Sequence, residues 1–112
     1  IKLKTSDLKL KTPGLILGES LAFELTLESC AQSTQTMVVD FALHLVKANG
    51  KTAAKVFKWK TVTLAPNQIL TIEKQHAIKK ITTRRYYSGE QVLEILINGK
   101  PVAQTTFALK VD

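Results

Sequence analysis

Hydrophobic and polar residues alternate along most of this chain with a period of two, which is typical of strands that bury one face. The clearest run extends from Leu21 to Glu28, where Leu21, Phe23, Leu25 and Leu27 alternate with polar or small residues. In an extended strand these four apolar side chains point to one face. We expect that face to cover the core of the domain.

Comparable runs follow along the chain, and no stretch has the spacing of an amphipathic helix. The N-terminal run is less regular, because its alternation breaks at Thr5–Asp7. Polar residues 31–35 form a linker. The expected strands cover residues 1–11, 21–28, 37–47, a return segment that carries Phe57 and Trp59 on one face, 69–77, 91–97 and 103–111.

Turn residues separate these runs. Asn49–Gly50 and Asn98–Gly99 predict tight hairpins, because Asn and Gly tolerate the positive φ angles of a type I′ turn. Pro66–Asn67 predicts another turn, in which proline sets φ in advance. Pro13–Gly14 is expected to turn the chain after the first strand.

Seven or eight strands at intervals of roughly 8–12 residues predict an all-β antiparallel sandwich of the immunoglobulin or fibronectin-III type. A small barrel is the alternative. The sequence departs from antibody domains at identifiable places. Leu25 stands where one of the paired cysteines would lie, Gln91 takes the position of the corner tyrosine, and Trp59 is on the return strand.

The composition is that of one folded domain spanning residues 1–112, with 45% hydrophobic and 22% charged residues. The chain begins at Ile1, so we expect a domain excised from a longer polypeptide. Cys30 is the single cysteine and excludes an internal disulfide. No apolar run approaches the roughly 20 residues of a membrane helix. We expect a cytoplasmic protein without membrane contact.

The net charge is +7, from 16 Lys and Arg against nine Asp and Glu. Such a balance favours encounter with nucleic acid, an anionic membrane or an acidic protein surface. Most of the charge is lysine spread along the chain, which also serves solubility. Lys55, Lys58 and Lys60 illustrate this, because lysines on one strand protect a sheet edge more often than they bind DNA.

Adjacent guanidinium groups and aromatic rings make Arg84–Tyr87 the best candidate site. In an immunoglobulin topology the loop at Asn49–Gly50 lies at the same end of the sandwich, so cations would gather there and neutralise phosphates. In the alternative, one tyrosine closes the sandwich end and the arginines pair with Glu90. Neighbouring rings in extended backbone should point in opposite directions, one inward and one outward. The candidate DNA- or partner-binding residues are Lys47, Lys51, Lys79, Lys80, Arg84, Arg85, Tyr86 and Tyr87.

Catalytic and metal chemistry find no support in the sequence. His44 and Asp40 share a strand face but lie about 13 Å apart, too far to share a metal ion. No nucleophile, base and orienting group can be assembled, and no phosphate loop is present. We expect no metal, no cofactor and no catalytic residue, and a structural thiol at Cys30.

Four blocks of the sequence carry a family resemblance: residues 39–51, 55–58, 64–66 and 81–90, which include VKANGK and ITTRRYYSGE. Together they resemble the C-terminal β-sandwich of bacterial HEAT-like-repeat DNA alkylation repair proteins, relatives of the 3-methyladenine DNA glycosylases. The likeness covers about residues 38–111. In that family a helical solenoid cradles DNA and excises alkylated bases. None of the solenoid is present here, so no glycosylase residue is carried over.

The resemblance implies a non-catalytic accessory domain of a DNA alkylation repair protein, whose partners are the helical repeat domain of its parent chain and double-stranded DNA. The alternative is a structural or protein–protein interaction module without nucleic-acid contact. Exposed cations clustered at one end would favour DNA, whereas buried tyrosines and paired arginines would favour the interaction module.

Overall fold

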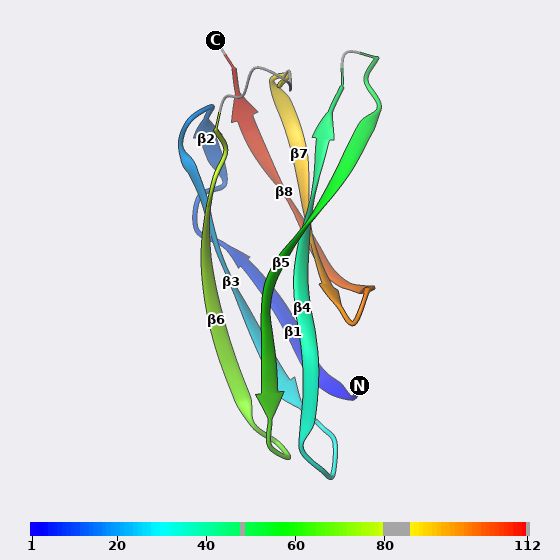
Figure 1. Ribbon diagram of the computed structural model, residues 1–112. Coiled ribbons are helices and arrows are strands. Elements are labelled where there is room, and N and C mark those ends of the chain that lie inside the picture. The colour runs from blue at the N-terminus through cyan, green and yellow to red at the C-terminus, as the bar shows by residue number, and fades with distance from the viewer. Residues whose placement is uncertain (48, 80–85, 112) are drawn as a thin grey trace.

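The computed structural model shows eight strands in two packed layers (Figure 1) and describes residues 1–47, 49–79 and 86–111. The described residues include no helix of the length and apolarity that a membrane crossing requires. The strands are β1 (Leu3–Leu10), β2 (Gly14–Ile16), β3 (Ser20–Ser29), β4 (Gln35–Val46), β5 (Thr52–Leu64), β6 (Ile69–Ala77), β7 (Gly89–Ile97) and β8 (Lys100–Lys110).

The strands form a three-stranded sheet, in the order β1-β3-β6, and a five-stranded sheet, in the order β2-β8-β7-β4-β5. Two separate sheets with open edges make a sandwich and not a barrel. The expected immunoglobulin or fibronectin-III-like class is therefore confirmed. β5 and β6, which follow each other in the chain, are edge strands of different sheets.

The core lies where the alternation placed it. Leu21, Phe23, Leu25 and Leu27 of β3 are fully buried, and they face the apolar residues of β4, β7 and β8 across the sandwich. Aromatic rings fill its middle: the ring centroids of Phe23 and Phe41 are 5.4 Å apart, and the centroid of Trp59 lies 5.2 Å from that of Phe23. Trp59 thus packs on the core from the return strand.

The N-terminal segment holds an element that the sequence did not reveal. After β1, whose pairing with β3 is irregular between Leu3 and Thr5, the chain does not simply turn at Pro13–Gly14. Residues Gly14–Ile16 instead pair in parallel with Ala108–Lys110 of β8. A strand of three residues is too short to show any alternation, so β2 could not be recognised.

One of the two predicted type I′ turns is wrong. Asn98 and Gly99 both have positive φ, 51° and 81°, as such a turn requires. At the other hairpin Gly50 has φ 79°, and its amide donates to the carbonyl of Lys47 over 3.0 Å, so the turn begins at Lys47. The amide of Lys47 donates to the carbonyl of Lys51 over 2.7 Å, so these two residues close the connection and three residues lie between them, where a two-residue type I′ turn would have two.

The molecule is long and narrow, with extents of 50 × 22 × 19 Å. The β4–β5 hairpin, the end of β6, the start of β7 and the end of β8 lie at one end (Figure 1). The N-terminus and the β3–β4 and β5–β6 connections lie toward the other end.

Candidate nucleic-acid interface

Three exposed lysines lie at the end of the sandwich that carries the β4–β5 hairpin. Lys47 and Lys51 flank the hairpin loop, and Lys79 lies two residues after β6, which finishes at the same end of the molecule (Figure 1). Within the described residues none of the three makes an ion pair with a carboxylate. We call these three lysines the basic pole. The predicted neighbours Lys80, Arg84 and Arg85 lie outside the described residues.

The hairpin holds two of these cations directly opposite each other. The amide N–H of Lys47 donates to the carbonyl of Lys51 over 2.7 Å, and the amide of Lys51 donates to Oδ1 of Asn49 over 3.0 Å. Like charges placed opposite each other across a pair of strands destabilise it. The hairpin therefore brings two positive charges together at a cost to its own stability.

Gln91 fixes the geometry of this end. Its side chain is 1% exposed, and its Oε1 accepts a hydrogen bond of 2.8 Å from the amide of Val46 at the end of β4. Its Nε2 donates to the carbonyls of Tyr87 and Gly89, over 3.0 and 3.4 Å. The residue at the corner-tyrosine position therefore joins the hairpin strand to the segment before β7.

The two tyrosines differ in their packing, although both are partly exposed. The ring of Tyr86 packs against the hydrophobic core, whereas Tyr87 is not among the residues that do so. Tyr86 is therefore the ring that turns toward the interior, and it stays partly exposed. Next to them, Ser88 accepts a hydrogen bond of 2.7 Å from the amide of Val111 and ties this segment to the end of β8.

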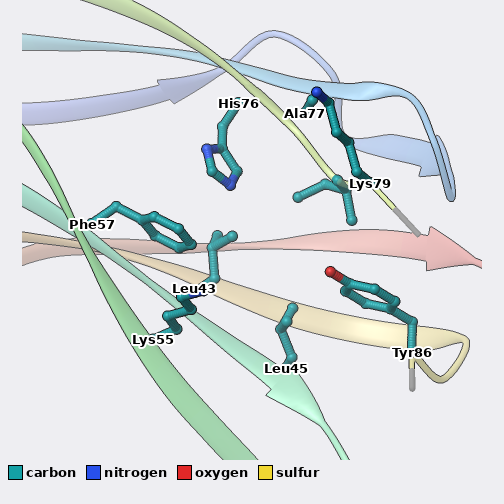
Figure 2. A pocket seen from close by; sticks show the side chains of 9 residues that line it. Leu43, Leu45, Lys55, Phe57, His76, Ala77, Lys79 and Tyr86 are labelled. Carbon is teal, nitrogen blue, oxygen red and sulfur yellow. The ribbon is translucent and has the colours of Figure 1, made fainter. Parts of the chain in front are cut away.

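A cavity of about 150 Å³ opens beside the basic pole, between the edges of the two sheets. Figure 2 shows its lining, with Phe57 and His76 on one side and Tyr86, whose hydroxyl points into the space, on the other. We call this space the edge cavity. It is lined by Leu43, Leu45, Lys55, Phe57, His76, Ala77, Ile78, Lys79 and Tyr86.

The pKa of His76 reflects the electrostatics of the edge cavity. Burial lowers the pKa of this imidazole below its usual value of 6.5, and the positive charges of Lys74 and Lys55 lower it further. Both effects disfavour the charged ring. Lys55 also places its Nζ 5.2 Å from the centroid of the Phe57 ring, in cation–π geometry. The cavity is therefore a place of positive potential.

Much of the acidic charge is neutralised elsewhere. On the outer face of the small sheet, Lys11 bonds Glu73 at 2.6 Å and lies 3.6 Å from Glu24, and Lys4 pairs with Glu28. The hydrogen bond between Lys11 and Glu73 raises the pKa of the lysine and lowers that of the carboxyl group. Because these carboxylates lie on the small sheet, the net positive charge is left to the other surfaces.

The remaining candidates from the sequence have structural places. Lys55, Lys58 and Lys60 lie on β5, which is an edge strand as the lysine pattern suggested. His44 pairs with Glu94 at 3.2 Å on the outer face of the large sheet. The described residues contain no group of three metal-ligating side chains. Cys30 is exposed.

Sequence reasoning missed the edge cavity and the role of Gln91. The sequence contained a signal for the cavity. His76 lies four residues after the buried Ile72 and therefore on the same face of β6, and Phe57 shares a face of its strand with Trp59. That the two rings meet at an open sheet edge depends on the strand order, which the sequence did not determine. For Gln91 the sequence showed only that the corner tyrosine is replaced, and not which hydrogen bonds the amide makes.

Comparison with known proteins identifies a family and two similar proteins. Residues 4–111 match the family described as "Uncharacterised protein YhaZ, C-terminal Ig-like domain". The YhaZ protein of Bacillus subtilis is 31% identical over 94 residues, which are 84% of this chain and 26% of that protein. Among solved structures, Pseudomonas fluorescens alkylpurine DNA glycosylase AlkC, bound to DNA containing an abasic site analogue, superposes with a TM-score of 0.88.

The AlkC match has 36% sequence identity and covers 97% of this chain and 30% of AlkC. A Listeria innocua β-glucosidase superposes with a TM-score of 0.73 at 17% identity, a likeness that shows the fold alone. The chain spans about a quarter to a third of YhaZ and AlkC. The resemblance to alkylation repair proteins is confirmed, and the chain belongs to the family of YhaZ C-terminal immunoglobulin-like domains.

Proposed function

We propose that this domain is a non-catalytic accessory module of a cytoplasmic DNA alkylation repair protein and that its basic pole contacts the phosphates of double-stranded DNA. The observation that carries the proposal is the gathering of Lys47, Lys51 and Lys79 at one end without carboxylate partners among the described residues. The likeness to AlkC, whose solved complex contains DNA, supports it.

The chemistry of the pole fits sequence-independent binding. Lysine ammonium groups act as point charges toward phosphates and do not read bases in a fixed geometry. Each phosphate neutralised releases condensed counterions, so the logarithm of the affinity falls with the logarithm of salt concentration by about 0.9 per contact. Three lysines therefore account for a slope of roughly −3, and Lys80, Arg84 and Arg85 would steepen it.

Titration of fluorescent duplex DNA with the domain tests the proposal through anisotropy at several salt concentrations. The triple variant Lys47→Ala/Lys51→Ala/Lys79→Ala should weaken binding and flatten the salt slope by about 3. A matched control is Lys2→Ala/Lys4→Ala/Lys100→Ala, which removes the same charge toward the other end. Equal losses in both variants would show that only net charge matters, and no binding at low salt would overturn the proposal.

A second function is favoured by the opposite end of the molecule. There a groove of about 440 Å³ is lined by Ile1, Leu3, Ile97 and Val102, among others, and Ile1 is 58% exposed. A groove beside the N-terminus with both apolar and polar lining suits contact with a neighbouring protein domain, such as the helical repeat domain that the family resemblance implies. The two functions use different ends and are compatible.

A further inference from the structure

The edge cavity exists because two edge strands face each other without pairing. β5 ends the five-stranded sheet and β6 ends the three-stranded sheet, so no strand closes the sandwich between them. Side chains that would be covered in the middle of a sandwich are instead reached from the edge. Phe57 and His76 are accordingly only partly buried, although the register directs both toward the interior.

The walls of the cavity suit a flat ring. The centroids of Phe57 and His76 are 4.5 Å apart with planes tilted by 55°, and Leu43 and Leu45 form an apolar floor. Tyr86 borders the other side and directs its hydroxyl inward (Figure 2). The volume of the edge cavity, about 150 Å³, equals that of engineered cavities that accept benzene, so one six-membered ring fits.

The charge of the cavity selects an anion. Lys55 and Lys79 are among the lining residues, and the charges of Lys74 and Lys55 both lower the pKa of His76. No Asp or Glu is among the described residues that line it. An apolar slot for one ring, bordered by cations, has the character of sites that stack a base and attract its phosphate.

We infer that the edge cavity binds one unstacked pyrimidine nucleotide of a DNA strand, with the base between Phe57, His76 and Tyr86 and the phosphate near Lys55 and Lys79. The inference rests on the proposed function, because it specifies which part of DNA the domain holds next to the basic pole. An intact duplex offers no free base, so the cavity would act at strand ends, gaps or disrupted pairs.

Titration of the isotope-labelled domain with thymidine 5′-monophosphate, followed by NMR, tests the inference. We expect saturable shifts at the His76 ring and at the amides of β5 and β6, and a rise in the His76 pKa as the phosphate approaches. Lys74, Lys55, Lys79 and Tyr86 are the other titratable groups around that ring. No response up to about 10 mM nucleotide, where even millimolar affinities are visible, would overturn the inference.

Two variants locate the site. Lys55→Gln and Phe57→Leu should each weaken nucleotide binding on the order of tenfold, since one variant removes a positive charge and the other an aromatic wall of the cavity. Lys58→Gln is the matched control. Lys58 lies on the same strand, but in the register it stands opposite Asp40, away from the cavity. Amide spectra show whether each variant is folded. Equal weakening by Lys58→Gln would contradict the assignment.

Further ligands separate the alternatives. If inorganic phosphate produces the same NMR shifts with the same affinity, the base does not contribute to binding. The edge cavity would then be an anion site only, and the inference would be wrong. An acidic peptide with a terminal aromatic residue that binds while the nucleotide does not would also overturn the inference. Titrations with duplex DNA on the same samples separate the two proposals. If the domain binds duplex DNA but not the nucleotide, the inference about the edge cavity is wrong. If it does not bind duplex DNA, the proposal for the basic pole is wrong.

Discussion

At the scale of single residues, Gln91 shows how a position can keep its structural task after its side chain changes. A corner tyrosine bonds backbone near the start of its strand with a hydroxyl group. The amide of Gln91 offers both an acceptor and donors, and it uses them on β4 and on the segment before β7. The buried amide thus connects two strands at the basic pole.

Replacement of Gln91 by Ala should lower the free energy of unfolding by about 2–3 kcal/mol, because the amide of Val46 loses its partner in a buried site. Chemical denaturation measures the change. Gln104→Ala on neighbouring β8 is the control, since Gln104 is exposed. A loss no larger than that of the control would mean that water replaces the amide without cost.

His76 gives the stability of the domain a pH dependence. Its imidazole binds a proton less readily in the folded chain than in the unfolded chain, whose pKa is near 6.5. The stabilisation is complete above that value and is lost as the pH falls through 6.5 toward the lower pKa of the folded state. The slope should be a fraction of the about 1.4 kcal/mol per pH unit of one fully linked proton.

His76→Gln should flatten this slope between about pH 7 and pH 5, as measured by denaturation at each pH. Carboxylates such as Glu73 titrate mainly below that range, so they contribute little to it. An unchanged slope in the variant would show that other groups cause the dependence.

At the scale of elements, β5 combines a sheet edge with charges that point inward. Lys55 pairs with Leu43 and Lys60 with Val39, two residues whose side chains are buried in the core. Trp59 is the extra residue where the register shifts between Val39 and Asp40. Inward lysines and a bulge both prevent another strand from adding to an edge.

The double variant Lys55→Val/Lys60→Val should therefore associate with itself as concentration rises, and sedimentation velocity would detect the dimers. Lys2→Val/Lys110→Val removes the same charge outside β5 and should remain monomeric. Association of both variants would assign the effect to net charge, and association of neither would mean that the bulge alone protects the edge.

Strands whose alternation extends over about eight or more residues could be predicted from the sequence, as β3 and β7 were, because periodicity accumulates over length. β2 could not, since its pairing depends on β8, far away in the chain. The prediction for Asn49–Gly50 was wrong because three residues, and not two, lie between Lys47 and Lys51, which close the connection. Among the site residues, the exposure of Lys47, Lys51 and Lys79 followed from polarity, whereas the edge cavity depends on how the two sheets meet.

At the scale of the whole molecule, the elongated shape separates two surfaces of different chemistry. The basic pole lies at one end, and the groove beside Ile1, which has both apolar and polar residues in its lining, lies toward the other. A domain of this shape can touch a neighbouring protein domain at one end and a polyanion at the other. Variants at the two ends should therefore act independently, because no side chain is shared.

The parallel pairing of β2 with β8 also determines how the domain responds to tension. A force that pulls the two ends of the chain apart along the long axis would shear β8 against β2, because the two strands pair in parallel. The bonds from Ala108 to Pro13 and from Leu17 to Lys110, each 2.9 Å long, run across that direction and bear the load together. The short strand that contributes little buried area thus becomes the mechanical clamp of the molecule.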